Sequence, residues 1–295
     1  MAKIIDGKKI AEEIKGKLQD ELEILKSKGI IPGIGVILVG DNPASHSYVD
    51  MKERSCEKLG INSIVKRFDK VISQEEVIKQ IEEFNQDKSI NGILVQLPLP
   101  NHLNENVILL KIDPDKDVDG IHPMNFGRLL AGDPIFIPCT PYGILEILQY
   151  EGIETDSKHA VVIGRSNIVG KPISVLLNRK AKNGNATVTM CHTRTKNLSD
   201  FTLQADILIS AMGVPNKITG DMIKEGAVVI DVGTNRVDDP TAKKGYKIVG
   251  DVEFESAEKK AGIISPVPGG VGPLTIAMLM KNTITAAKRQ AGFPI

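Results

Sequence analysis

Residues 159–172 have the sequence HAVVIGRSNIVGKP. This segment predicts a buried strand that ends at Gly164 and a helix that begins at Gly170, with Pro172 tolerated in the first helical turn. A glycine turn between a strand and a helix suits a bound pyrophosphate, because the backbone can approach closely and the helix N-terminus offers free N–H groups. The spacing differs from G-x-G-x-x-G, so an ordinary glycine turn is the alternative when the segment is taken alone.

The residues that follow the next predicted strand bear on the choice of dinucleotide. NAD-binding domains usually carry Asp or Glu there, which holds the ribose 2′-hydroxyl, but residues 191–196, CHTRTK, contain no carboxylate. We therefore expect NADP, whose 2′-phosphate suits hydroxyl and cationic side chains at four positions: Arg165, Thr193, Arg194 and Lys196. Simple solvation is the alternative for Arg194 and Lys196.

Alternating strands and helices extend on both sides of this turn. Short apolar strands are predicted at residues 33–40, 61–68, 90–97, 160–164, 186–190, 207–212 and 228–232. Helices are predicted at residues 10–25, 45–59, 142–150, 170–180 and 274–287, and a capping box of Ser73 and Glu76 opens another. The alternation predicts parallel α/β sheets.

An irregular segment rich in Pro, Asp and Asn, residues 98–141, interrupts this alternation and indicates two domains. The predicted fold class is α/β, with an N-terminal α/β domain, a C-terminal Rossmann-like NADP-binding domain and a cleft between them. We assign residues 1–138 and the C-terminal helical segment 274–295 to the first domain, and residues 139–273 to the second.

The bulk composition excludes several classes of partner. The 295 residues carry no net charge, so electrostatics favours neither nucleic acid nor an anionic membrane surface. No apolar run approaches the roughly 18 residues of a membrane helix, and the three cysteines lack a zinc-binding spacing. We expect a cytoplasmic protein without a metal site, a nucleic-acid partner or a membrane partner.

Tyr48 and Lys52 are four residues apart in the helix predicted at 45–59, so they share one helical face. If this face is buried, desolvation lowers the pKa of Lys52 and makes the amine usable as an acid or a base. A lysine that extends to solvent is the alternative. Short-chain dehydrogenases also carry Tyr-x-x-x-Lys, but after the dinucleotide turn, whereas here it precedes the turn by more than a hundred residues.

Taken together, the motifs of this chain resemble those of the bifunctional methylenetetrahydrofolate dehydrogenase/methenyltetrahydrofolate cyclohydrolase (FolD) family. The resemblance extends from Ile4 to the final helix. It is carried by seven segments in order: VGDNPASHSYVDMK at 39–52, GILVQLPLP at 92–100, PDKDVDGIH at 114–122, PCTP at 138–141, GRSNIVGKP at 164–172, DVGTN at 231–235 and PVPGGVGP at 266–273.

The resemblance implies two successive reactions on tetrahydrofolate derivatives. 5,10-Methylene-tetrahydrofolate is oxidised to the 5,10-methenyl cation with transfer of a hydride to NADP, and water then opens the cation to 10-formyl-tetrahydrofolate. The family is dimeric and serves one-carbon metabolism, including purine, histidine and methionine biosynthesis. The resemblance makes the first domain the folate-binding catalytic domain.

The resemblance also assigns site residues. It implies that Lys52 is central to hydrolysis, that Gln96 hydrogen-bonds Lys52, that Tyr48 packs against the folate and that Asp119 binds the pterin. These four are the expected catalytic residues. The expected cofactor-binding residues are Gly164, Arg165, Ser166, Thr193 and Thr234. The expected folate-binding residues are Tyr48, Gln96, Asp119, Pro268, Gly269 and Gly272.

Each of these assignments has a structural alternative. Gln96 could cap a strand, Asp119 could hold its own loop through an Asx turn, and Ser166 could be a helix N-cap. The chain departs from the family at Thr193, where Ser is more common, and at Thr234, where Ile is usual. The alternative functions are a monofunctional NAD-dependent methylene-tetrahydrofolate dehydrogenase, a non-catalytic nucleotide-sensing module and an amino-acid or shikimate-type dehydrogenase.

Overall fold

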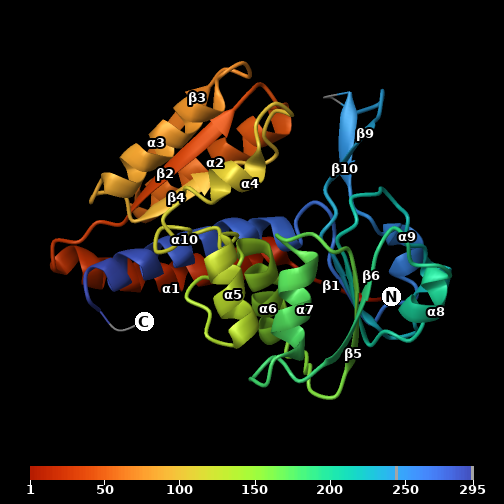
Figure 1. Cartoon of the computed structure of the whole chain (residues 1–295). Coiled ribbons are helices and arrows are strands. Elements are labelled where there is room, and N and C mark those ends of the chain that lie inside the picture. The colour runs from red at the N-terminus through yellow and green to blue at the C-terminus, as the bar shows by residue number, and fades with distance from the viewer. Residues whose placement is uncertain (243–244, 294–295) are drawn as a thin grey trace. The chain divides into compact units, whose positions relative to one another are not determined.

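The computed structural model describes residues 1–242 and 245–293, and the chain divides into two compact units (Figure 1). The three-stranded unit comprises Glu13–Cys139 and Ile276–Ile295, and the six-stranded unit comprises Met1–Glu12 and Thr140–Thr275. Residues 243–244 of the predicted second domain and residues 294–295 of the predicted C-terminal segment lie outside the described residues.

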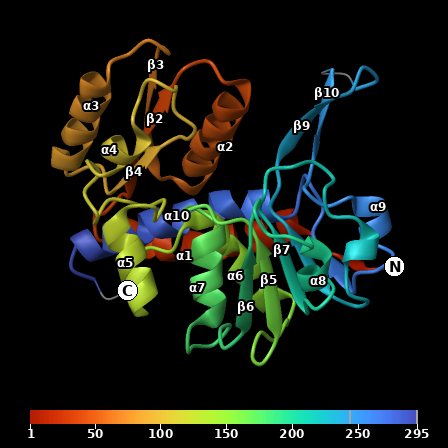
Figure 2. The same cartoon turned by 45° about the vertical axis from the view of Figure 1, so that its right-hand side comes forward.

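The three-stranded unit is built around a parallel sheet with the strand order β3-β2-β4. The strands are β2 (Gly33–Val39), β3 (Asn62–Phe68) and β4 (Gly92–Val95). Helices α2 (Pro43–Leu59) and α3 (Gln74–Gln86) lie on opposite sides of the sheet (Figure 2). β2 is central and buried along its whole length, which explains why its sequence is apolar at nearly every position rather than alternating.

Local sequence signals fix the ends of α2 and α3. The Asn42 side chain accepts hydrogen bonds from the first turn of α2, and Gly60 ends the helix in a left-handed conformation with φ of 75°. The predicted capping box is present, since Ser73 and Glu76 each accept a hydrogen bond from the backbone N–H of the other. These caps place one face of α2 against the sheet, with Ser45, Val49, Lys52, Cys56 and Leu59 buried.

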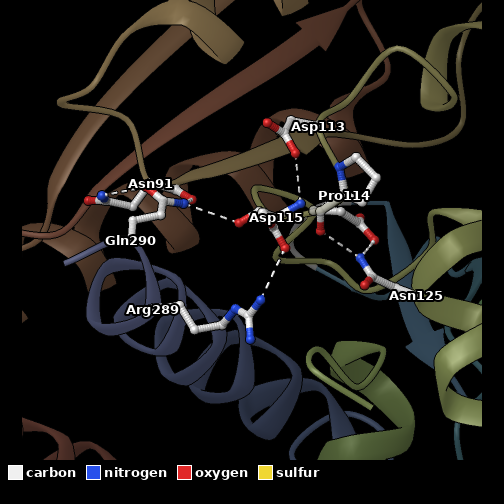
Figure 3. Close-up of polar contacts among 8 residues, drawn as sticks. Asn91, Asp113, Pro114, Asp115, Asn125, Arg289 and Gln290 are labelled. Atoms are coloured by element: carbon white, nitrogen blue, oxygen red, sulfur yellow. Dashed lines mark hydrogen bonds and ion pairs between the residues drawn. The ribbon is translucent and has the colours of Figure 1, made fainter. Parts of the chain in front are cut away.

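The irregular segment after β4 contains two short helices, α4 (Glu105–Leu109) and α5 (Pro123–Ala131). Its Asp113–Asp119 part is held by the end of α10 (Val271–Gln290) (Figure 3). Gln290 Nε2 donates to the carbonyls of Asn91 and Asp115, and Arg289 pairs with the Asp115 carboxylate at 3.4 Å. Backbone carbonyls and one ion pair thus order a segment that has no strand or long helix of its own.

The six-stranded unit has a parallel sheet with the order β1-β11-β8-β7-β5-β6. The strands are β1 (Lys3–Ile4), β5 (His159–Ile163), β6 (Thr187–Cys191), β7 (Ile207–Ser210), β8 (Val228–Asp231) and β11 (Ile263–Ile264). The order reverses beside β5, whose neighbours are β6 and β7. In open α/β sheets a ligand binds at the carboxyl ends of the strands at such a reversal.

Shorter elements complete the six-stranded unit. The helices are α6 (Cys139–Tyr150), α7 (Gly170–Asn178), α8 (Leu198–Thr202), α9 (Phe254–Ala257) and the 3-10 turn η1 (Gly220–Met222). β9 (Asn235–Asp238) and β10 (Tyr246–Val249) form an antiparallel hairpin that extends away from the sheet (Figure 2).

The N-terminal residues belong to this second sheet. β1 pairs with β11, Lys3 opposite Ile263, and Met1–Glu12 therefore lies in the six-stranded unit, whereas the sequence analysis placed these residues in the first domain. Helix α1 (Gly7–Ser27) begins in one unit and ends in the other. Within the described ranges, no helix is both long enough and apolar enough to span a membrane.

Candidate active site

Lys52 and Gln96 form a hydrogen-bonded pair in the three-stranded unit, in which Lys52 is buried and Gln96 is half-buried. Lys52 lies on the inner face of α2 with 7% of its surface exposed, so the alternative of a lysine extended to solvent is wrong. Its Nζ donates to Gln96 Oε1 at 2.9 Å, as expected. Gln96 directly follows β4, and its Nε2 donates to the Leu97 carbonyl at 2.7 Å. That second bond turns the amide so that its oxygen faces Lys52.

Burial controls the protonation of Lys52. Desolvation lowers its pKa, and the nearby carboxylate of Asp119 acts in the opposite direction. Burial also raises the pKa of the neighbouring Cys56 thiol to about 12 and that of Cys139 well above its usual value, so both thiols stay neutral. The surroundings therefore favour a neutral amine more than water does, and a neutral amine can accept a proton.

The loop that carries Asp119 is shaped by a neighbouring carboxylate that sequence analysis missed. Asp117 is fully buried and accepts hydrogen bonds from Ile121 N at 3.2 Å and from His122 N at 2.8 Å. It also accepts one from Asn125 Nδ2, which reaches back to the Pro114 carbonyl as well (Figure 3). The Asx-type role considered for Asp119 is thus performed by Asp117. The alternating aspartates of PDKDVDG were the available signal, but they do not show which one is buried.

Tyr48 lies one helical turn before Lys52 on α2 and is half-buried. The structure therefore brings the four expected catalytic residues into one unit, with a hydrogen bond between Lys52 and Gln96 and an electrostatic interaction between Lys52 and Asp119. Their roles stay predictions. Across residues 1–242 and 245–293, no three His, Cys, Asp or Glu side chains gather in a way that could hold a metal ion.

The six-stranded unit has a pocket of about 200 Å³ at the carboxyl ends of β5, β6 and β7, at the reversal of strand order. It is lined by Ile163, Gly164, Arg165, Ser166, His192, Thr193, Ala211 and Met212. Four of the five expected cofactor-binding residues line it. Sequence analysis missed Ile163, His192, Ala211 and Met212 as lining residues. Ile163, Ala211 and Met212 lie at the C-terminal ends of predicted strands and His192 lies two residues beyond one, so their positions could have indicated them.

The glycines of the turn are required by close packing. Gly164 has φ of 130°, a conformation that side chains rarely adopt, and a Cβ there would overlap the Ala211 carbonyl oxygen. A Cβ on Gly170 would likewise overlap the carbonyl of Gly164. The Ser166 hydroxyl accepts hydrogen bonds from Val169 N at 3.1 Å and Gly170 N at 3.3 Å. Ser166 therefore caps the turn before α7 and also lines the pocket.

Other expected residues lie elsewhere in the six-stranded unit. Thr234 is exposed in the loop after β8 and is not among the lining residues of the pocket. Pro268 and Gly269 form the turn before α10, and Gly272 lies in its first helical turn. Arg194 and Lys196 are exposed beyond the end of β6.

Comparison with known proteins gives the same two-part division. A family model described as the tetrahydrofolate dehydrogenase/cyclohydrolase catalytic domain matches residues 5–119. A second, described as the NAD(P)-binding domain of the same enzymes, matches residues 138–291. Together with the two parallel sheets, these matches confirm the predicted two-domain α/β fold class with a Rossmann-like C-terminal domain.

Individual relatives are similar over nearly the full chain. The bifunctional protein FolD of Chlorobium chlorochromatii is 54% identical over 292 residues, 98% of this chain and 99% of that protein. The solved FolD dehydrogenase/cyclohydrolase of Campylobacter jejuni is 48% identical with a TM-score of 0.91, covering 98% of this chain and 99% of that one. The Trypanosoma brucei enzyme, solved with NADP and an inhibitor, is 39% identical with a TM-score of 0.94, covering 99% of each chain. The chain therefore belongs to the tetrahydrofolate dehydrogenase/cyclohydrolase family.

Proposed function

We propose that this chain is a bifunctional enzyme of folate metabolism. It oxidises 5,10-methylene-tetrahydrofolate to the 5,10-methenyl cation with NADP as hydride acceptor, and it hydrolyses that cation to 10-formyl-tetrahydrofolate. The observation that carries the proposal is the hydrogen bond between buried Lys52 and Gln96 in the family's catalytic domain, together with the glycine turn and pocket in its NAD(P)-binding domain.

The six-stranded unit supplies the cofactor side. Its pocket fits a dinucleotide because the turn of Gly164, Arg165 and Ser166 lines it between the carboxyl end of β5 and the N-terminus of α7, a position that favours bound phosphate. Gly164 and Ser166 would bind the pyrophosphate, Arg165 would bind the 2′-phosphate of the adenosine with Thr193 nearby, and Thr234 would contribute its backbone. When bound, NADP supplies the hydride acceptor. The Trypanosoma brucei relative, solved with NADP, supports this choice.

The oxidation needs little acid–base chemistry from the chain. The carbon that loses hydride lies between two nitrogens, so the substrate itself stabilises the resulting cation. What the protein must supply is alignment of the donor carbon with the acceptor. We assign part of this positioning to Tyr48 and Asp119 in the three-stranded unit, and to Pro268, Gly269 and Gly272 in the turn that leads into α10.

The hydrolysis needs a base near neutrality. Water adds to the methenyl carbon, its oxygen forms the new C–O bond and its proton passes to neutral Lys52 Nζ. The bond from that carbon to N5 then breaks while the new hydroxyl group loses its proton and becomes the formyl carbonyl on N10. One of the two water protons ends on N5, the other leaves to solvent, and Lys52 is neutral again. A cationic substrate beside Lys52 further disfavours the protonated amine. Gln96 keeps Nζ in place by its hydrogen bond at 2.9 Å.

The monofunctional NAD-dependent alternative is less supported. The Chlorobium chlorochromatii and Bacillus subtilis relatives, 54% and 52% identical over 98% of this chain, are named bifunctional. The Lys52–Gln96 pair that hydrolysis needs is also present. The chain also has no carboxylate in residues 191–196 to hold a ribose 2′-hydroxyl.

We further propose the domain roles and the cellular setting. The three-stranded unit, which contains most of residues 1–138 and 274–295, binds folate, and the six-stranded unit, which contains residues 140–273, binds NADP. The enzyme acts in the cytoplasm as a homodimer, without nucleic-acid or membrane partners, and feeds purine, histidine and methionine synthesis. Family membership supports these assignments.

Two separate assays test the proposed function. With 5,10-methylene-tetrahydrofolate, the enzyme is expected to reduce NADP much faster than NAD at equal concentration. With 5,10-methenyl-tetrahydrofolate and no nucleotide, it is expected to accelerate loss of the methenyl absorbance above the buffer rate. Activity only with NAD and no accelerated hydrolysis would establish the monofunctional alternative instead.

Gln96→Glu is expected to move the pH profile of hydrolysis upward by about 1–3 pH units. A carboxylate within hydrogen-bonding distance of Lys52 Nζ raises the pKa of the amine, so less neutral lysine is present at pH 7. The measurement is the hydrolysis rate from pH 6 to pH 10. Gln86→Glu at the exposed end of α3 is the matched control and should leave the profile in place. An unchanged pH profile in Gln96→Glu would show that Gln96 does not influence the protonation of Lys52.

Arg165→Ala is expected to weaken NADP binding by roughly 10- to 100-fold, because charge-assisted hydrogen bonds contribute about 1.5–3 kcal/mol. NAD lacks the 2′-phosphate, so its binding should change by less than about threefold. Dissociation constants for both nucleotides, measured by calorimetry, give the comparison. Lys158→Ala, at the opposite end of β5, controls for a general loss of positive charge. Equal losses for the two nucleotides would contradict recognition of the 2′-phosphate by Arg165.

A further inference from the structure

The Asp251 carboxylate is completely buried in the six-stranded unit, two residues after β10. One oxygen accepts hydrogen bonds from Met212 N at 2.7 Å, Gly213 N at 3.2 Å and the Ser210 hydroxyl at 3.3 Å. The other accepts from Val214 N at 3.0 Å and from Asn235 Nδ2 at 2.9 Å. These five donors occupy both carboxylate oxygens of Asp251.

The donors come from the last residue of β7, from the loop that follows it, and from Asn235, which directly follows the loop after β8. Three consecutive backbone N–H groups, from residues 212 to 214, point at the one carboxylate, which sets the shape of the loop after β7. That loop contains Ala211 and Met212, which line the dinucleotide pocket. Asn235 begins β9, directly after the loop that contains Thr234. Asp251 therefore ties one wall of the pocket to the neighbouring loop.

A second buried carboxylate holds Asp251 in place. Asp231, at the end of β8, accepts hydrogen bonds from Asp251 N at 3.0 Å, Gly233 N at 2.9 Å and Val252 N at 2.9 Å. The close contact between these carboxylates and the backbone depends on two glycines. A Cβ on Gly233 would overlap the Asp251 carboxylate, and one on Gly250 would overlap that of Asp231. The arrangement is thus built into the backbone on both sides of the hairpin.

The order of strands indicates which part of the cofactor these loops face. If the pyrophosphate lies at the Gly164 turn after β5, the adenosine extends toward β6, where Thr193 follows the strand end. The nicotinamide half then extends the other way, over β7 and β8. These are the strands whose following loops Asp251 holds together.

We propose that Asp251 is a positioning residue for hydride transfer: it holds the loops after β7 and β8 in the shape that the nicotinamide half of NADP requires. The inference rests on the proposed function. Asp231 acts indirectly, because it holds the backbone of Asp251. Since Asp251 is fully buried, it has no direct contact with substrate or cofactor.

Asp251→Asn is the variant that tests this proposal. The amide keeps the size of the side chain but replaces one acceptor by a donor, which faces N–H groups that need acceptors. We expect kcat/KM for NADP-dependent oxidation to fall about 10- to 100-fold, since a misplacement of about 1 Å can cost 10²-fold. Affinity for 2′,5′-ADP, the adenosine half alone, should stay within twofold, as should hydrolysis of 5,10-methenyl-tetrahydrofolate in the absence of nucleotide.

Two further variants keep the test decisive. Asn235→Ala removes only one donor, and a severalfold loss of the same kind is expected if Asp251→Asn does not fold. Asp238→Asn, exposed on β9, is the matched control and should behave as wild type. Equal losses of NADP and 2′,5′-ADP binding, or unchanged oxidation in a folded Asp251→Asn, would overturn the inference. Wild-type enzyme that forms no NADPH would instead refute the proposed function.

Discussion

Lys52→Met is expected to slow the hydrolysis of 5,10-methenyl-tetrahydrofolate by about 10²- to 10⁴-fold, the usual contribution of a general acid–base group. Methionine is similar in length and suits a site that is 7% exposed, so folding and NADP binding should be preserved. Two measurements distinguish a loss of catalysis from a loss of folding: the rate of hydrolysis without nucleotide, and the dissociation constant of NADP. Lys58→Met, on the exposed face of the same helix, is the matched control. Unchanged hydrolysis in Lys52→Met would remove Lys52 from its role.

The same variant has an expected effect on stability. Because burial lowers the pKa of Lys52, the unfolded chain takes up a proton at this residue more easily than the folded chain does. Wild-type stability is therefore reduced as the pH falls below the ordinary lysine pKa, and this reduction is absent from the variant. The Tm of Lys52→Met at pH 7 should equal or exceed that of the wild type. A large decrease in Tm would contradict the inference that the buried amine of Lys52 destabilises the folded state.

Gly164→Ala is expected to abolish most NADP-dependent oxidation, with a loss of about 10²-fold or more. The alanine methyl would overlap the Ala211 carbonyl, and the φ of 130° at this position is strained for any side chain. Either the turn or the loop after β7 must move, and a displacement of about 1 Å can cost 10²-fold in rate. Hydrolysis of the methenyl compound, assigned to Lys52 in the other unit, should be retained.

A matched glycine distinguishes this site effect from general damage. Gly16 lies inside α1 with nothing within 4 Å of its missing Cβ. Gly16→Ala should keep both activities and gain up to about 1 kcal/mol of stability, because alanine has the higher helix propensity. The kinetic constants for NADP are the measurement. If Gly164→Ala left them unchanged, the turn would not be the phosphate-binding element.

The regular part of the fold could be predicted from local signals. The capping residues around α2 and α3 are encoded within a few positions of the helix ends, and β2 is a continuous apolar run bounded by glycines. β1 and β11 could not be found this way, because two-residue strands have no periodicity and their pairing joins Lys3 to Ile263 across most of the chain. The hairpin of β9 and β10 was missed for a similar reason: its strands have only four residues each.

The candidate site, too, could be predicted from the sequence only in part. Spacing indicated that Tyr48 and Lys52 share a helical face, but it could not tell burial from solvent exposure, which depends on the sheet beneath α2. The functions of Asp117 and Asp251 were not visible in the sequence because their partners are mostly backbone N–H groups, which have no residue identity. A buried aspartate and a solvated one look alike until the loop around them is known.

The most direct test of the account is an end-point balance of products. Wild-type enzyme is incubated with 5,10-methylene-tetrahydrofolate and NADP, and the NADPH and 10-formyl-tetrahydrofolate formed are quantified together. The account predicts equal amounts of the two, with 10-formyl-tetrahydrofolate appearing faster than buffer alone hydrolyses the methenyl intermediate. No reduced cofactor, or NADPH accompanied by methenyl-tetrahydrofolate that hydrolyses only at the buffer rate, would contradict a bifunctional enzyme.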